Sequence, residues 1–135
     1  MDTPNEVRRF TFKKPEANEL IDHNTELTAS VVKAEFTMSN AGNDMIVLHA
    51  DLLGEDGRVR RSIREHAVFT EKAEWKLNQI AESLGFASED GVEVEFSAET
   101  LTGRTARVRV IQETYIDGGG KEQTTNRIGA WLAAA

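Results

Sequence analysis

Two runs of alternating apolar and polar residues, joined by a short acidic turn, constrain this chain more than any other feature. In Met45–Leu53, apolar side chains fall at every second position, and His49 and Asp51 lie between them. The run Arg58–Phe69 repeats this alternation, with arginines and a histidine on its polar face. A period of two on both sides of the turn Gly54–Gly57 predicts a β-hairpin with one buried face.

Other segments alternate in the same way. We expect strands over Thr28–Met38, Arg104–Tyr115 and Gln123–Leu132, and a short strand or extended loop over Val92–Phe96. The inward side chains of these strands and of a helix described below should form one core. The expected core residues are Val32, Phe36, Ile46, Leu48, Leu77, Ile80, Leu84, Val108 and Val110.

A helix is predicted directly after the hairpin. Thr70 suits the N-cap position, apolar residues recur at helical spacing from Ala73 to Leu84, and Gly85 is a typical residue just past a helix end. Trp75 falls outside the apolar stripe. It is therefore either covered by a strand or by the N-terminal arm, or exposed as an anchor for a partner.

Three strands, a helix and two more strands, in this order, match the oligonucleotide/oligosaccharide-binding (OB) fold. We therefore predict an all-β protein with one helix, whose five strands close into an OB-fold barrel. An open α+β sandwich is the alternative. In OB folds the ligand crosses the second and third strands between two loops, which here would be Ser39–Asp44 and Asp117–Glu122.

The chain divides into two regions on this interpretation. Residues 29–135 would form the OB-fold-like domain, and residues 1–28 would form an N-terminal arm or edge strand. Within that region, Phe10 and Phe12 lie between two basic pairs. As an arm, this segment would contact nucleic acid through rings and cations. As an edge strand, it would pack its two rings on the domain.

Composition narrows the classes of function. The formal net charge of −7 disfavours bulk binding to phosphate backbones, but the charge is uneven, and four of the seven residues in Arg58–Arg64 are arginine. Without cysteine, and with three histidines that lack metal-ligand spacing, no metal site is expected. We also find no phosphate loop or nucleophile elbow, so we expect no enzyme and no cofactor. The lack of a long apolar run predicts a cytoplasmic protein without membrane contact.

Five short runs point to a family. They are Ser39–Met45, Thr70–Leu77, Leu84–Gly85, Leu101–Arg104 and Asn126–Ile128. With them, the chain from about Ala29 to Leu132 resembles a family of small proteins encoded in phage replication and recombination cassettes. That family is regarded as similar to single-stranded-DNA-binding proteins. The resemblance implies single-stranded DNA binding during replication or recombination in a host cytoplasm, and it supplies no catalytic residues.

A single-strand site needs cations for phosphates and rings on which bases stack. The predicted contact residues are Arg58, Arg60, Arg64, His66, Arg107, Arg109, Tyr115 and Lys121. Arg61 should point to the opposite side of its strand. The alternative for the arginines is a solvated face balanced by carboxylates, and the alternative for Tyr115 is packing within a loop.

Two functions therefore stay open. One is a single-stranded-DNA-binding protein of phage type. The other is a protein-interaction module on the same fold, which binds or inhibits a phage or host replication, recombination or defence protein. Either could form homo-oligomers.

Overall fold

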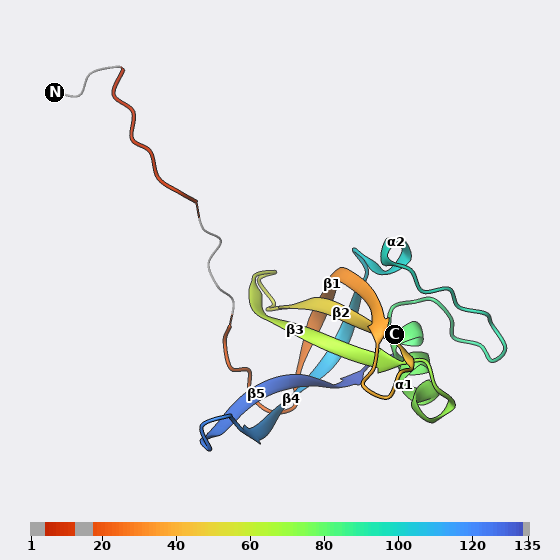
Figure 1. Cartoon of the computed structure of the whole chain (residues 1–135). Coiled ribbons are helices and arrows are strands. Elements are labelled where there is room, and N and C mark those ends of the chain that lie inside the picture. Colours follow the sequence, from red (N-terminus) through yellow and green to blue (C-terminus); the bar gives the residue numbers. More distant parts are fainter. Residues whose placement is uncertain (1–4, 13–17, 134–135) are drawn as a thin grey trace.

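The structure is a computed structural model that describes residues 5–12 and 18–133. Its centre is one antiparallel sheet of five strands in the order β3-β2-β1-β4-β5 (Figure 1). The strands are β1 (Thr25–Met38), β2 (Asp44–Leu53), β3 (Val59–Val68), β4 (Thr105–Ile116) and β5 (Glu122–Trp131), and the helical elements are η1 (Glu71–Ala73), α1 (Glu74–Ser83) and α2 (Ala98–Leu101). The predicted mainly β architecture is confirmed.

The hairpin of β2 and β3 forms where the alternation predicts it, but the register shifts between Leu52 and Leu53, which pair with Arg61 and Val59, so the regular alternation begins only beyond Arg60. The even-numbered apolar side chains of β2 are buried, and the odd-numbered side chains of β3 turn toward the same core. The buried or core-packed residues of these two sets are Ile46, Leu48, Ala50, Leu52, Ile63, Glu65 and Ala67, and the odd-numbered Val47 of β2 is buried as well. In the turn, the amide of Gly57 donates to the carbonyl of Gly54 at 2.9 Å, and Gly57 has a φ of +80° that favours glycine. Sequence pattern and turn chemistry therefore agree on this hairpin.

The strand β1 lies at the middle of the sheet and pairs with both β2 and β4. Its register against β2 shifts between Val31 and Lys33, which leaves Val32 as an extra residue in a β-bulge. The bulge changes which side chains point inward. Our expectation that Val32 belongs to the core is therefore wrong, since it is 49% exposed. The expectation for Phe36 is wrong as well: it has the same parity as Ala34 but lies at the end of β1, where the last residues are exposed, and it is itself 52% exposed. Ala34 is the buried residue on the far side of the bulge.

The predicted helix is present as η1 followed by α1. The Thr70 hydroxyl accepts a hydrogen bond from the amide of Ala73 at 3.3 Å, as an N-cap should. Ile80 and Leu84 are buried in the core, and Leu77 packs against it while partly exposed. The segment Val92–Phe96 is an extended loop, which is one of the two alternatives expected for it. The short helix α2 that follows was not predicted.

Residues 18–24 lie between the two edge strands. Glu19 donates its amide to the carbonyl of Arg60 on β3 at 3.0 Å. On the other side, Asn126 of β5 accepts from the Ile21 amide at 2.8 Å and donates to the Ile21 carbonyl at 2.9 Å. Arg61 spans the gap, donating to the Glu19 carbonyl at 3.1 Å and to the Thr125 hydroxyl at 3.0 Å. This segment thus covers edges that would otherwise be unpaired, and Ile21 is fully buried.

A buried carboxylate links the same two strands elsewhere. Glu65 of β3 accepts from the indole N–H of Trp131 on β5 at 3.1 Å and forms an ion pair with Lys76 of α1 at 3.2 Å. Within the described residues, β3 and β5 are in contact, but no hydrogen-bonded ladder joins them. Side chains and the N-terminal segment therefore hold the edges of the sheet together.

Residues 5–12 form no strand. They extend as an arm, defined here as these eight residues, that is drawn apart from the sheet in Figure 1. Phe10 and Phe12 are 86% and 78% exposed, so they do not pack on the domain as the edge-strand alternative requires. Among the helices of the described residues, none has the length and apolar character needed to cross a membrane.

Candidate nucleic-acid interface

The outer face of β1, β2 and β3 carries the polar side chains that alternate with the core. On β3, Ser62, Arg64 and His66 are exposed while Glu65 and Ala67 between them are buried. The predicted outward positions of Arg64 and His66 are therefore confirmed. Side chains on this face point away from the core, so a ligand could lie across the three strands without unfolding any of them.

Strand register places three basic side chains in one row across this face. Lys33 of β1 is directly opposite His49 of β2, and His49 is directly opposite Arg64 of β3. Neighbouring strands lie about 4.8 Å apart, so the row spans about 10 Å. Lys33 and His49 were not among the predicted contact residues, because alternation places each on a face but does not say which residues become neighbours.

A carboxylate lies within this row. Glu35 pairs with Lys33 at 2.7 Å and with the Nε2 atom of His49 at 3.0 Å. Hydrogen bonds from Lys33 and then His49 lower the pKa of Glu35 from 4.5 to about 2. Glu35 is therefore ionised at neutral pH and offsets the charge of Lys33. In the described part of the chain, Arg64 has no carboxylate within 4.0 Å and keeps its guanidinium available to a ligand.

Arg58, just before β3, and Arg60, near the start of the strand, differ in availability. Arg60 forms a two-pronged ion pair with Glu19, at 2.8 and 3.0 Å, which lowers the pKa of Glu19 and raises that of Arg60. Its fork is thereby occupied within the chain. Arg58 lies 3.9 Å from Asp56, and its side chain is 88% exposed. Arg58 can thus turn toward a phosphate at little cost, whereas Arg60 would first have to leave Glu19.

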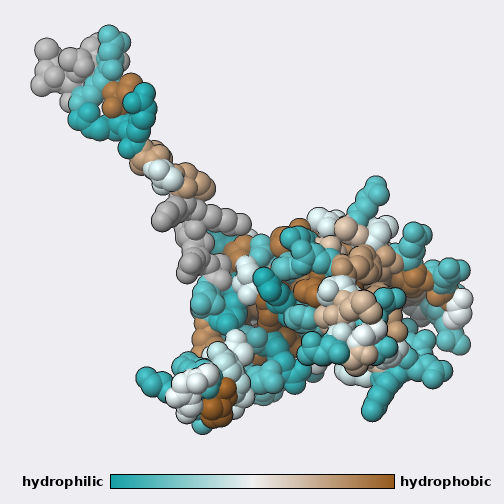
Figure 2. Space-filling model, in the orientation of Figure 1, coloured by the Kyte–Doolittle hydropathy of each residue, from teal (hydrophilic) through white to brown (hydrophobic). Residues whose placement is uncertain are grey.

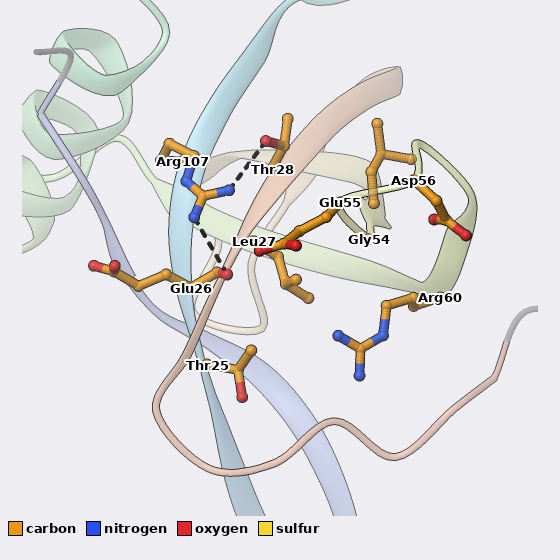
Figure 3. A pocket seen from close by; sticks show the side chains of 10 residues that line it. Thr25, Glu26, Leu27, Thr28, Gly54, Glu55, Asp56, Arg60 and Arg107 are labelled. Atoms are coloured by element: carbon orange, nitrogen blue, oxygen red, sulfur yellow. Dashed lines mark hydrogen bonds between the residues drawn. The ribbon is translucent and has the colours of Figure 1, made fainter.

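Arg60 and Arg107 line a pocket of about 760 Å³ between the beginning of β1 and the β2–β3 turn (Figure 3). Arg107 donates to the Thr28 hydroxyl at 3.3 Å and to the Glu26 carbonyl at 3.4 Å. Three carboxylates, those of Glu26, Glu55 and Asp56, line the same pocket against the two guanidiniums. This balance makes the pocket a poor site for phosphate.

The remaining predicted residues lie elsewhere. Arg109 is 3.8 Å from the carboxylate of Glu26, on a strand that is three strand spacings, or about 14 Å, from β3. Tyr115 is exposed near the end of the β4–β5 hairpin, which projects from the body in Figure 1. Lys121 lies in its turn. The eight predicted contact residues therefore lie in separate places: on or just before β3, in the acidic pocket, on β4 beside Glu26, and at this hairpin.

The β4–β5 turn is built around one carboxylate. Asp117 accepts from the amides of Gly119 at 2.9 Å and Lys121 at 3.0 Å, and from the Gln123 side chain at 3.0 Å. These hydrogen bonds, first that of Lys121, lower the pKa of Asp117. The Asp117 side chain thus holds the turn in place through hydrogen bonds, even though three glycines follow it in the sequence.

Aromatic residues gather at the end of the sheet where α1 begins. The rings of Phe36 and Phe69 stack with centroids 6.3 Å apart, and Trp75 is 64% exposed. The expectation that another segment covers Trp75 is therefore wrong, and its exposure fits the alternative of a partner anchor. Sequence alone did not associate Phe36 with Phe69, since their contact depends on how β1, β2 and β3 pair.

In the described ranges, no three histidine, aspartate or glutamate side chains gather to hold a metal ion. No protein-family model matches the chain, and no curated protein matches it at a significant level.

Proposed function

We propose that this protein is a non-catalytic single-stranded-DNA-binding protein with an OB fold. The strand order β3-β2-β1-β4-β5, with the helix α1 between β3 and β4, supports the OB fold, because it is the order of that barrel opened between its third and fifth strands. The observation that carries the function is the exposed pair Arg64 and His66 on the outer face of β3, where OB folds bind oligonucleotides, together with the exposed Arg58 just before that strand.

Arg58 and Arg64 would pair with phosphates, since a guanidinium fork matches two phosphate oxygens. Bases would stack on the His66 ring and on the guanidinium planes. Tyr115 and Lys121 would close over the strand from the β4–β5 hairpin, in the position of the loop that grips ligands in OB folds. Arg60, Arg107 and Arg109 are held by neighbouring acidic or carbonyl groups and would contribute less.

The resemblance to phage proteins supports a role in replication or recombination, in the cytoplasm of a host cell. The few available cations predict modest binding with a shallow salt dependence. Each phosphate neutralised on a single strand adds about 0.7 to the slope of log K against log salt, so Arg58 and Arg64 together account for about 1.4.

Fluorescence anisotropy with labelled oligo-dT, at salt concentrations between about 50 and 200 mM, tests this proposal. The variant Arg58→Ala/Arg64→Ala should bind more weakly, with a slope reduced by about 1.4. Lys72→Ala/Arg127→Ala is the matched control, because it removes two exposed cations away from β3. Equal binding by wild type and the β3 variant would refute the proposal.

Arg61 does point away from the outer face, yet it is unsuitable as a neutral control. Its guanidinium bonds to the N-terminal segment and to Thr125, so Arg61→Ala would loosen the closure of the sheet.

The protein-interaction module is a second candidate, favoured by the exposed rings of Phe36, Phe69 and Trp75. Rings of this kind are typical anchors of protein interfaces. Absence of oligo-dT binding by the wild type, even at low salt, would favour this candidate over DNA binding.

A further inference from the structure

An apolar pocket with an acidic rim lies where β3 meets η1 and α1. Its volume is about 240 Å³, and it is lined by Phe69, Thr70, Glu71, Glu74 and Leu77. Leu77 and the Phe69 ring supply apolar surface, and the exposed carboxylates of Glu71 and Glu74 supply negative charge. We call it the Phe69 pocket. It suits a segment that presents an aromatic ring beside positive charges.

The arm of residues 5–12 has that chemistry. Phe10 and Phe12 are almost fully exposed, and Arg8 and Arg9 directly precede them. Two lysines follow Phe12 in the sequence. Figure 2 shows hydrophilic and hydrophobic residues close together along this segment. Exposed phenylalanines are costly to leave in water, so a surface that covers both rings would stabilise the arm.

We propose that the arm of one copy of this chain docks in the Phe69 pocket of a second copy. A phenylalanine ring would enter between Phe69 and Leu77, and Arg9 would pair with Glu71 or Glu74. Arg8, which is paired with Glu6 of the arm, would add to this attraction on leaving Glu6. Reciprocal exchange of arms would close a dimer, whereas one-way docking would build a chain of copies. Neither arrangement needs DNA, so this inference stands apart from the function proposed above.

The length of the tether favours a second copy over the arm's own chain. The Glu19 amide is fixed to Arg60 at the start of β3, and Phe69 follows Arg60 by nine residues, or about 30 Å along the strand. Phe12 precedes Glu19 by seven residues, which span at most about 25 Å. Phe12 therefore falls short of its own pocket, and Phe10 would reach it only on a straight chain. In a second copy, both rings can reach.

Sedimentation velocity of the full chain over a range of concentrations tests the proposal. The wild type should self-associate, less strongly as salt rises from about 50 to about 500 mM, because the ion pairs are exposed. Phe10→Ala/Phe12→Ala and Glu71→Lys/Glu74→Lys should each weaken the association constant by a factor on the order of ten or more. Thr11→Ala is the matched arm control and should associate as the wild type does.

Mixing two variants separates docking between copies from docking within one chain. Phe10→Ala/Phe12→Ala keeps an intact pocket, and Glu71→Lys/Glu74→Lys keeps an intact arm. Each alone should be monomeric, and the mixture should form heterodimers. The changed side chains are all exposed, so the fold should be kept, although lysines in the first turns of η1 and α1 should weaken the start of the helix slightly, which circular dichroism would measure.

Three results would overturn the proposal. They are a wild type that is monomeric at every concentration, self-association that survives loss of both arm phenylalanines, and a mixture that does not associate. The second result would indicate that another surface joins the copies, and the third that the arm of one copy does not enter the Phe69 pocket of another.

Discussion

Asn126 carries the attachment of the N-terminal segment to the sheet, so Asn126→Ala should destabilise the fold. Its side chain makes three hydrogen bonds, with the amide and the carbonyl of Ile21 and, at 3.1 Å, with the carbonyl of Ile111. Alanine would leave the Ile21 amide without an acceptor in a buried position. The Ile21 carbonyl would keep a second donor, the Gln112 side chain, at 3.1 Å.

An orphaned buried donor costs about 1–3 kcal/mol, and each further hydrogen bond about 0.5–1.5 kcal/mol. We therefore expect Asn126→Ala to lower the free energy of unfolding by about 2–4 kcal/mol. Such a loss is a large share of the roughly 5–15 kcal/mol that stabilises a typical domain. Urea unfolding followed by circular dichroism measures it, and hydrogen exchange should show the Ile21 amide losing protection.

Thr124→Ala is the control, because Thr124 is an exposed residue of the same strand. It should change the free energy of unfolding by less than about 0.5 kcal/mol. A similarly small loss for Asn126→Ala, with the Ile21 amide still protected, would refute the role assigned to this side chain.

Three further predictions follow from polar contacts. Glu65→Ala should lower the free energy of unfolding by about 1–3 kcal/mol in urea, because it leaves the Trp131 indole N–H without an acceptor. Glu35, with its depressed pKa of about 2, should stabilise the fold fully above its ordinary pKa of 4.5, and this contribution should be lost as the pH falls through about 2. Lys33→Met should raise the titration midpoint of the Glu35 carboxyl, as measured by NMR. Asp117→Ala should speed hydrogen exchange of the β4–β5 turn amides, and unchanged exchange would contradict its role in that turn.

Local pattern was sufficient for the elements whose partners lie nearby in the chain. Alternation in β2 and β3 predicted which side chains are buried, because a short turn fixes how the two strands pair. The helix was predicted from its cap, stripe and terminal glycine for the same reason. Glu65 shows what alternation does not predict. Its place in β3 indicates that the side chain points inward, but its partners Lys76 and Trp131 come from other elements.

Long-range features could not be predicted in this way. The bulge at Val32 changes the phase of β1, and no residue there signals an extra position. Burial of Ile21 depends on Asn126, which lies 105 residues further along the chain. The candidate site has the same limitation. Alternation put Arg64 and His66 on the outer face, but only register revealed that His49 lies beside Arg64 and that Glu19 occupies Arg60.

An NMR titration of the ¹⁵N-labelled protein with oligo-dT, followed through backbone amide shifts, tests most directly whether single-stranded DNA binds this face. Binding of single-stranded DNA across the sheet should give the largest shifts on the outer face of β2 and β3, around His49, Arg64 and His66, with smaller shifts in the β4–β5 hairpin. Shifts concentrated around Arg60 and Arg107 in the acidic pocket, or no shifts at low salt, would contradict single-stranded DNA binding across this face.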